Sequence, residues 1–364
     1  MTSNPKNSSQ PLVAVVTLGG TIAMIPASGG AGGAVPALSG EQLVAAVPEL
    51  SDPTFGLEVH SFRQLPGASL GVDDVLKLAA LVEQLVEGGV AGVVVTQGTD
   101  TIEETAYLLD LVYTGSAPVV VTGAMRNPSM AGADGPANLL GAVRVAASPQ
   151  ARGLGCLVVL NDEIHAARYV RKTHSTDTGA FASPNTGPLG RVVEGMPRIL
   201  AAPRSRHPLG KVPFDAAVRV ALVTLTLGDD GQLLRSIDER FGGLVIAAFG
   251  AGHVPATVAP LLGELAGRLP VVLASRTGAG PVLRITYGFP GSEQDLLGRG
   301  LISAGFLDPL KARVLLQLLL MQGADRTAIR EAFALAGAMA EAIAVDKPAA
   351  DRQPPAPPLP VATK

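Results

Sequence analysis

Several residue types are scarce in this chain of 364 residues, and each scarcity excludes a class of protein. There is a single cysteine, Cys156, so no disulfide can form within one chain. It lies in an apolar run, where we expect a buried strand thiol. The histidines show no metal-ligand spacing, which argues against a zinc protein. They are His60, His165, His174, His207 and His253.

Charged residues are also scarce. They make up 16% of the chain, the formal net charge is −3, and no dense stripe of lysine and arginine is present. We therefore expect neither nucleic acid nor a membrane surface as a partner. No uninterrupted apolar stretch approaches the roughly 20 residues that span a bilayer. Residues 1–10 are polar and lack the features of a secretory signal, which predicts a cytoplasmic protein.

Apolar residues and glycine are abundant instead, since the chain is 47% hydrophobic and contains 43 glycines. Valine-rich runs recur and are continuous rather than alternating, as in strands that are covered on both faces. The first of these runs lie at 12–16, 92–95, 118–121 and 157–160. Helical patterns separate them at 72–86, 101–112 and 137–147. This alternation predicts an α/β fold with a parallel sheet.

The stretch 197–213 interrupts the alternation and has the proline content of a connection between domains. Strand patterns resume at 218–225, 243–248 and 269–274, and the last helical patterns cover 308–322 and 325–345. We predict a larger N-terminal parallel-sheet domain at 11–200, a linker at 201–213 and a smaller C-terminal α/β domain at 214–345. The Pro- and Ala-rich residues 346–364 predict a disordered tail.

The most informative segment begins where the apolar pattern at 93–95 ends. Thr99 and Asp100 follow it, and a helical pattern starts directly after them. Thr101 and Glu104 have the spacing of a capping box, which places Thr99 and Asp100 between a strand end and a helix N-terminus. Open parallel sheets bind ligands at that place, and free backbone N–H groups there favour anionic groups.

A second hydroxyl, Thr21, follows the first apolar run in a similar setting. Threonine is a poor nucleophile unless another group removes its proton or organises that removal. Asp100 stands beside Thr99 for this purpose, and Lys172 lies in a polar stretch after the strand pattern at 157–160. A partly desolvated lysine beside a carboxylate can shuttle protons. Spacing alone cannot bring Lys172 to Thr99, and taken singly it is typical of a solvated loop lysine.

These segments resemble the two threonine signatures of the bacterial asparaginase/glutaminase family, here at 17–23 and 96–106. The resemblance covers nearly the whole folded chain, about 12–344. Its further blocks lie at 122–126, 133–139, 159–162, 172–173, 250–253 and 309–316. It implies a two-domain α/β fold, homo-oligomers that are tetramers built from intimate dimers, and no metal or organic cofactor.

The resemblance also implies roles for individual residues. Thr21 corresponds to the nucleophile, while Thr99, Asp100 and Lys172 form a second catalytic group. Thr99 and Asp100 also belong to the substrate-binding set, in which Asp100 corresponds to the carboxylate that holds the substrate's α-amino group. Glu293 matches the acidic residue that family enzymes lend across a subunit interface. The implied reaction hydrolyses the side-chain amide of L-asparagine to L-aspartate and ammonia through a threonine acyl-enzyme.

Two departures from the family pattern bear on the expected substrate. The Ser-Gln pair that usually grips the substrate's α-carboxylate is Ala68 and Ser69 here, so Ala68 offers only its backbone. His253 stands where an asparagine is common. These departures put the identity of the substrate in question more than the type of reaction.

A third departure concerns the lid over the first threonine. The glycine-rich patch 29–34 is interpreted as a mobile lid, with a surface hairpin tip as the alternative. Family enzymes usually carry a tyrosine in this lid, but none occurs between residues 23 and 43, and Gly33 falls near its place. Either another hydroxyl substitutes for the tyrosine, or the proton path at Thr21 differs.

Other functions also fit parts of the sequence. Residues 67–71 match G-x-S-x-G, the nucleophile elbow of α/β-hydrolases, with Ser69 as nucleophile. Residues 19–21 could form a nucleotide-binding turn, although they lack the glycine spacing of the known phosphate-binding loops. Within the same fold, a glutaminase, an amidase with another substrate or a weakly catalytic amino-acid sensor are the alternatives to an asparaginase.

Overall fold

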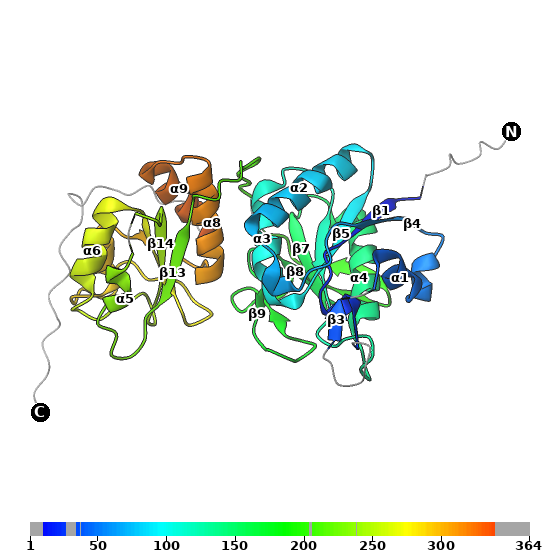
Figure 1. Cartoon of the computed structure of the whole chain (residues 1–364), viewed down its shortest axis with the longest axis horizontal. Helices are drawn as coiled ribbons and strands as arrows, with labels where there is room; N and C mark the ends of the chain where they lie inside the picture. Colours follow the sequence, from blue (N-terminus) through cyan, green and yellow to red (C-terminus); the bar gives the residue numbers. More distant parts are fainter. Residues whose placement is uncertain (1–9, 27–33, 37, 204–205, 238, 339–364) are drawn as a thin grey trace, which may run out of the picture.

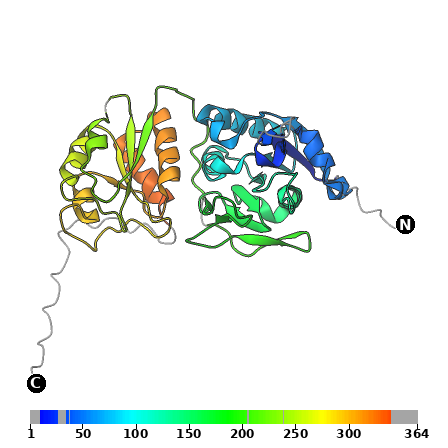
Figure 2. The same ribbon diagram turned by 60° about the horizontal axis from the view of Figure 1, so that its bottom comes forward.

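The computed structural model describes residues 10–26, 34–36, 38–203, 206–237 and 239–338. Figures 1 and 2 show two α/β domains side by side, the first coloured blue to green and the second mainly yellow to orange. The expected two-domain α/β fold is therefore confirmed. The glycine-rich patch at 29–33, Gly33 included, and the tail at 346–364 lie outside the described residues.

The N-terminal domain contains an eight-stranded sheet in the order β12-β11-β8-β7-β6-β5-β1-β4. Its strands are β1 (Leu12–Thr17), β4 (Gly56–Ser61), β5 (Gly92–Thr96), β6 (Val119–Thr122), β7 (Cys156–Leu160), β8 (Glu163–Ala166), β11 (Gly190–Val193) and β12 (Met196–Ile199). Two small hairpins lie outside it, one from β2 (Met24–Pro26) and β3 (Ala34–Pro36), the other from β9 (Arg171–Lys172) and β10 (Phe181–Ala182).

This sheet is mixed, which corrects the expectation of a parallel one. The five strands from β4 to β7 in the sheet order are parallel to one another. Beyond them, β8 pairs antiparallel with β7, β11 with β8, and β12 with β11. Two-residue turns reverse the chain. Asn161 and Asp162 between β7 and β8, and Glu194 and Gly195 between β11 and β12, all have positive φ. Positive φ at both central residues is the geometry of tight hairpin turns.

Helices cover both faces of the sheet, as the continuous apolar strands predict. Alternate residues of each central strand enter two different apolar clusters. The first cluster includes α2 (Val72–Glu87) and α3 (Ile102–Val112), while the second includes α1 (Gly40–Ala45) and α4 (Gly135–Ala147). Short 3₁₀ turns complete the domain: η1 (Thr21–Ala23), η2 (Pro48–Ser51), η3 (Gly67–Ser69), η4 (Thr99–Thr101) and η5 (Pro149–Ala151).

The C-terminal domain has a four-stranded parallel sheet in the order β13-β14-β15-β16. Its strands are β13 (Val220–Thr224), β14 (Gly243–Ala248), β15 (Val271–Ser275) and β16 (Ile302–Ser303). Its helices are α5 (Gln232–Arg235), α6 (Ala259–Arg268), α7 (Glu293–Gly298), α8 (Pro309–Met321) and α9 (Arg326–Ala336). The helix α9 ends at Ala336 with Gly337 as its C-cap, whereas the pattern covered 325–345; residues 339–345 of that range lie outside the described residues.

The apolar core is continuous between the domains. The cluster that covers one face of the large sheet also contains residues of α8, α9 and the small sheet. The helices α3 and α8 pack against each other where the domains meet, as Figure 1 shows. Among the residues that the structure describes, no helix is both long and apolar enough to cross a membrane.

Candidate active site

Three turns of the N-terminal domain meet through glycines. Gly20 has φ +86°, and a Cβ atom there would lie 2.0 Å from the amide nitrogen of Gly98. A Cβ atom on Gly67 would lie 2.7 Å from the carbonyl oxygen of Gly98. Real Cβ atoms do not approach backbone atoms so closely, so only glycine permits these contacts. The turns before Thr21 and Thr99 are therefore in direct backbone contact, and η3 packs against the same point.

Thr99 and Asp100 lie in η4, directly between β5 and α3. The position agrees with the sequence, but the expected capping box does not form. Thr101 is the N-cap of α3 without a side-chain cap, because its hydroxyl donates to the carbonyl oxygen of Gly67 at 3.0 Å instead. The Gln97 amide donates to the same hydroxyl at 3.2 Å. These bonds tie η4 to η3, a contact that the local sequence did not signal.

Lys172 reaches this seam from β9, although 73 positions separate it from Thr99. Its Nζ donates to Thr99 Oγ1 at 2.9 Å and to Asp100 Oδ1 at 3.1 Å. The Thr99 residue is buried, the Lys172 side chain is 16% exposed, and the Asp100 side chain is 62% exposed. The lysine is thus no solvated loop residue. It joins a buried hydroxyl to a carboxylate that remains open to a ligand.

Thr21 begins η1 and is partly exposed. Gly19 and Gly20, both with positive φ, turn the chain sharply between β1 and this residue. The backbone contact between Gly20 and Gly98 brings Thr21 to the same end of the sheet as Thr99. The site is therefore assembled from the carboxyl ends of β1 and β5, which are neighbouring parallel strands.

Ala68 and Ser69 lie in η3 and are both exposed beside Gly67. This geometry does not fit a nucleophile elbow, in which the serine sits on the turn that leads directly from strand to helix. Here β4 ends at Ser61, well before Ser69, so the serine does not sit on a turn that leads directly from a strand; it ends η3, shortly before α2 begins at Val72.

Three other blocks that resemble the family, 122–126, 133–139 and 159–162, are joined to one another by hydrogen bonds. Asp134 accepts hydrogen bonds from the amides of Met125 and Arg126, at 3.0 and 2.9 Å. Asn138 donates to the carbonyl oxygen of Gly123 and accepts from the amide of Asn161. These bonds fasten the loops after β6 and β7 to the start of α4, so the polar residues of these blocks have a structural use.

Glu293 is the one candidate from the C-terminal domain, and its side chain is fully buried at the start of α7. Its Oε1 accepts from the amides of Thr286 and Tyr287 at 2.9 and 2.7 Å, and its Oε2 lies 3.2 Å from His253 Nε2. Burial raises the pKa of Glu293, but the hydrogen bonds from Tyr287, Thr286 and His253 outweigh this and lower it. Of this pair, only His253 reaches the surface, because its side chain is 24% exposed and that of Glu293 is fully buried.

The sequence did not signal this pairing between His253 and Glu293, since 40 positions separate the two residues. The imidazole also packs edge-on against the rings of Tyr287 and Phe289, both of which are exposed. Within the described part of the chain, no group of His, Cys, Asp and Glu residues is arranged to hold a metal ion.

Comparison with known proteins gives a consistent result for both domains. Residues 12–204 match the family described as asparaginase, N-terminal, and residues 219–333 match the glutaminase/asparaginase C-terminal domain. A probable L-asparaginase of Deinococcus radiodurans is 40% identical, with 90% of this chain and 98% of that protein covered. A glutaminase-asparaginase of Pseudomonas fluorescens biotype A is 34% identical, with 88% and 89% covered.

A solved structure is similar as well. The crystal structure of a probable cytoplasmic L-asparaginase from Campylobacter jejuni superposes with a TM-score of 0.79 at 34% identity. The match covers 89% of this chain and 99% of that one.

Proposed function

This chain belongs to the asparaginase family, and we propose that it hydrolyses the side-chain amide of L-asparagine to L-aspartate and ammonia. One observation carries the proposal beyond family membership. The Lys172 ammonium contacts both Thr99 and Asp100, directly beside the turn that bears Thr21. Two hydroxyls, an amine and an open carboxylate can supply a nucleophile and the groups that transfer its proton, which is what stepwise amide hydrolysis needs.

In the first step, Thr21 Oγ forms a bond to the carbonyl carbon of the side-chain amide. The C–N bond then breaks, the hydroxyl proton passes to the leaving nitrogen, and ammonia departs from an acyl-threonine. In the second step, water adds to the ester carbon, the C–O bond to Thr21 breaks, and the oxygen of Thr21 regains a proton. Both steps pass through an oxyanion, which nearby backbone N–H groups at η4 would stabilise; loss of one such donor typically costs about 10²–10³ in rate.

Thr99, Lys172 and Asp100 serve the proton transfers in this scheme. Because Lys172 Nζ donates to Thr99 Oγ1, the Thr99 hydroxyl hydrogen is free to point toward a substrate or a water molecule. The Asp100 carboxylate balances the charge of Lys172 and, with its large exposed fraction, is open to the ammonium of an amino-acid substrate. The ammonium group of the substrate would then form an ion pair with Asp100, beside the pair that Asp100 forms with Lys172.

Recognition of the substrate's α-carboxylate differs here from the usual family arrangement. Ser69 is the one exposed hydroxyl of η3, and Ala68 contributes its backbone alone. We assign the carboxylate contact to Ser69 and the backbone of η3. Since this grip lacks a glutamine, the second candidate function is hydrolysis of L-glutamine or another amide, and one relative is named a glutaminase-asparaginase.

We also propose a cytoplasmic location and a homo-oligomer, in line with the cytoplasmic asparaginase of similar structure and with the family resemblance. In such an assembly Glu293 would act at a neighbouring subunit's site, and its contact with His253 makes the imidazole the group that reaches outward. Light scattering tests this assignment. If the active species has the mass of a single chain, about 37.0 kDa, Glu293 has no role in catalysis between subunits.

The experiment that tests the function is ammonia release by the purified protein from L-asparagine, L-glutamine, D-asparagine and simple aliphatic amides, with Thr21→Ala as the control. Preferential release from L-asparagine is the expected result. Release from a different amide would keep Thr21 as nucleophile and move the specificity. A folded protein that binds an amino acid in calorimetry without releasing ammonia would be a sensor and would refute the proposal.

A further inference from the structure

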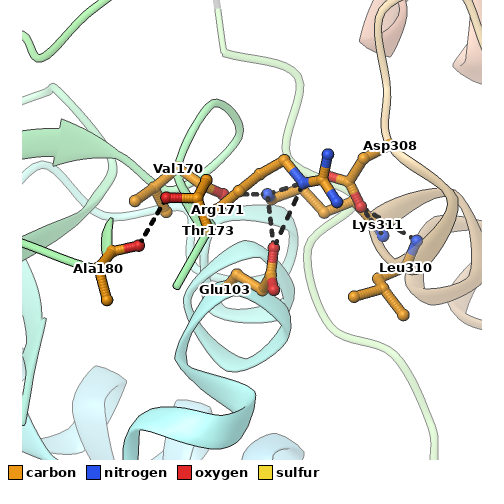
Figure 3. A network of polar contacts seen from close by, with 8 residues as sticks. All are labelled: Glu103, Val170, Arg171, Thr173, Ala180, Asp308, Leu310 and Lys311. Atoms are coloured by element: carbon orange, nitrogen blue, oxygen red, sulfur yellow. Dashed lines mark hydrogen bonds and ion pairs between the residues drawn. The ribbon is translucent and has the colours of Figure 1, made fainter. Parts of the chain in front are cut away.

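Lys311 is a fully buried lysine that lies outside the candidate active site, in the first turn of α8. Figure 3 shows its side chain extending from the C-terminal domain to the N-terminal one. Its Nζ donates to the carbonyl oxygen of Val170 and, at 3.0 Å, to Asp308 Oδ2. A buried ammonium is costly unless it is paired and hydrogen-bonded, so these partners fix its position closely.

The same ammonium also faces the first turn of α3. Glu103 Oε2 lies 4.0 Å from Lys311 Nζ and 3.9 Å from Arg171 Nε, and among the described residues it accepts no hydrogen bond. Burial raises the pKa of Glu103 to about 6, although the charges of Lys311 and Arg171 oppose that shift. In Figure 3 the carboxylate faces both cations from the helix that begins directly after η4.

Asp308 is the more permanent counter-charge of Lys311. Its carboxylate caps α8 by accepting from the amides of Leu310 and Lys311, and it also receives the Lys311 ammonium. Burial raises the pKa of Asp308, but the charge and hydrogen bonds of Lys311 outweigh this and lower it. The ammonium is thus held to the rigid start of a helix.

These contacts converge on the two segments that carry catalytic groups. Val170 directly precedes β9, whose second residue is Lys172, and Glu103 lies three residues after Asp100. The hairpin of β9 and β10 pairs only two residues on each strand, so its own ladder places Lys172 weakly. A second bond across the domains, from the amide of Gly280 to Asn185 Oδ1 at 2.8 Å, holds the chain that follows the hairpin.

We propose that Lys311 is a positioning residue, which through Val170 and Glu103 holds Lys172 against Thr99 and Asp100. The inference depends on the proposed function, because it assigns Lys311 an effect on catalysis through Lys172. A misplacement of about 1 Å in a catalytic group can cost about 10²-fold in rate. A merely structural staple between the domains would instead lower stability and leave the turnover of the folded enzyme unchanged.

The test is a double-mutant cycle on the full-length enzyme with L-asparagine as substrate. Lys311→Met removes the ammonium with little change of shape. We expect kcat to fall at least about 10-fold and KM to change less than about 3-fold, because the substrate contacts remain. In the Lys172→Met background the same substitution should cause no further loss of kcat, since its effect passes through Lys172.

Gln317→Met is the matched control. Gln317 is also buried on α8, and its amide donates to the carbonyl oxygen of Val218 at 3.2 Å, within the C-terminal domain. This variant removes a buried polar contact of the same helix and should keep kcat within about 3-fold of the wild type. Circular dichroism and the thermal midpoint show whether each variant is folded.

Two results would overturn the inference: a folded Lys311→Met enzyme with wild-type kcat, or an equal loss of kcat in both backgrounds. If Lys311→Met does not fold, Asp308→Asn replaces it, because asparagine keeps the helix cap and removes the counter-charge. It should lower kcat about 3-fold or more in the wild-type background only, and equal effects in both backgrounds would count against the inference. Wild-type kcat in Lys172→Met itself would refute the catalytic role of Lys172, a separate failure.

Discussion

Gly20 and Gly98 touch backbone to backbone, and this contact sets the distance between the two threonine turns of the site. The separation is too short for any Cβ atom, since one on Gly20 would come within 2.0 Å of the Gly98 nitrogen. Parallel pairing of β1 with β5 brings the strand ends together, and the glycines allow the turns that follow to close completely.

Gly20→Ala should therefore abolish activity and destabilise the fold. Gly89→Ala is its matched control, because Gly89 also has positive φ, +101°, but has no atom within 4 Å of a Cβ position. Both variants place a side chain at a positive φ, which costs on the order of 1–3 kcal/mol in such sparsely populated backbone regions. Only Gly20→Ala adds a clash, so its thermal midpoint should fall further and its ammonia release should disappear. Equal midpoints and activities in both variants would contradict the close contact.

Thr21→Ala and Thr99→Val should each lower kcat at least about 10³-fold, as expected when a nucleophile or its activating group is lost. The two should differ in what remains. In Thr21→Ala no acyl-enzyme can form, whereas Thr99→Val keeps the nucleophile, removes one hydrogen-bond acceptor of Lys172 and leaves the other, Asp100. Steady-state ammonia release measures both, and a near-normal rate in either variant would remove that residue from the mechanism.

Ser69→Ala should raise KM for L-asparagine several-fold and leave kcat nearly unchanged, because the proposed contact of η3 with the substrate's α-carboxylate lies away from the reacting carbon. Ala68→Gly, which removes no polar group, is the control and should leave KM unaltered. Complete loss of turnover in Ser69→Ala would instead make this serine essential to the chemistry. Initial rates over a range of L-asparagine concentrations separate the two parameters.

Glu103→Gln should change stability in a pH-dependent way. The pKa of Glu103 is raised from 4.5 to about 6 by burial, so the folded state binds the proton more tightly than the unfolded state does. The stabilisation of the folded state by protonated Glu103 is fully present below about pH 4.5 and is lost as the pH rises through about 6. At pH 8 the ionised carboxylate thus costs about 2 kcal/mol, which a neutral glutamine avoids.

Urea unfolding at pH 5 and pH 8 measures this difference. The variant should gain free energy of unfolding relative to the wild type at pH 8 and gain little at pH 5. Glu49→Gln, at an exposed position, serves as control. Its free energy of unfolding should differ from that of the wild type by the same amount at pH 5 and at pH 8. A loss of stability in Glu103→Gln at pH 8 would show that its charge is needed by Lys311 and Arg171.

The sequence predicted those features that depend on local pattern. Continuous valine runs identified the central strands, and a hydroxyl beside a carboxylate after β5 located the seam at Thr99 and Asp100. The hairpin turn at Asn161 and Asp162 carried a local signal as well, because both residue types tolerate positive φ, yet a uniform parallel sheet was expected.

Other features could not be predicted because they join distant positions. Lys172 was assigned through family resemblance, since it lies 73 positions after Thr99 and nothing in the chain between them specifies its approach. The pairing of His253 with Glu293 and the burial of Lys311 against Val170 depend equally on tertiary packing. The roles of the site residues remain predictions for the experiments above.

The packing of α8 against α3 has a consequence for how this protein can be recombined. Every proposed catalytic group except Glu293 is encoded in the first 172 residues, yet the ammonium that braces β9 comes from residue 311. Chimeras that exchange C-terminal domains between relatives would therefore take their catalytic groups from one parent. The residue that positions Lys172 would come from the other. The boundary between the two domains in the sequence therefore does not separate two functionally independent modules.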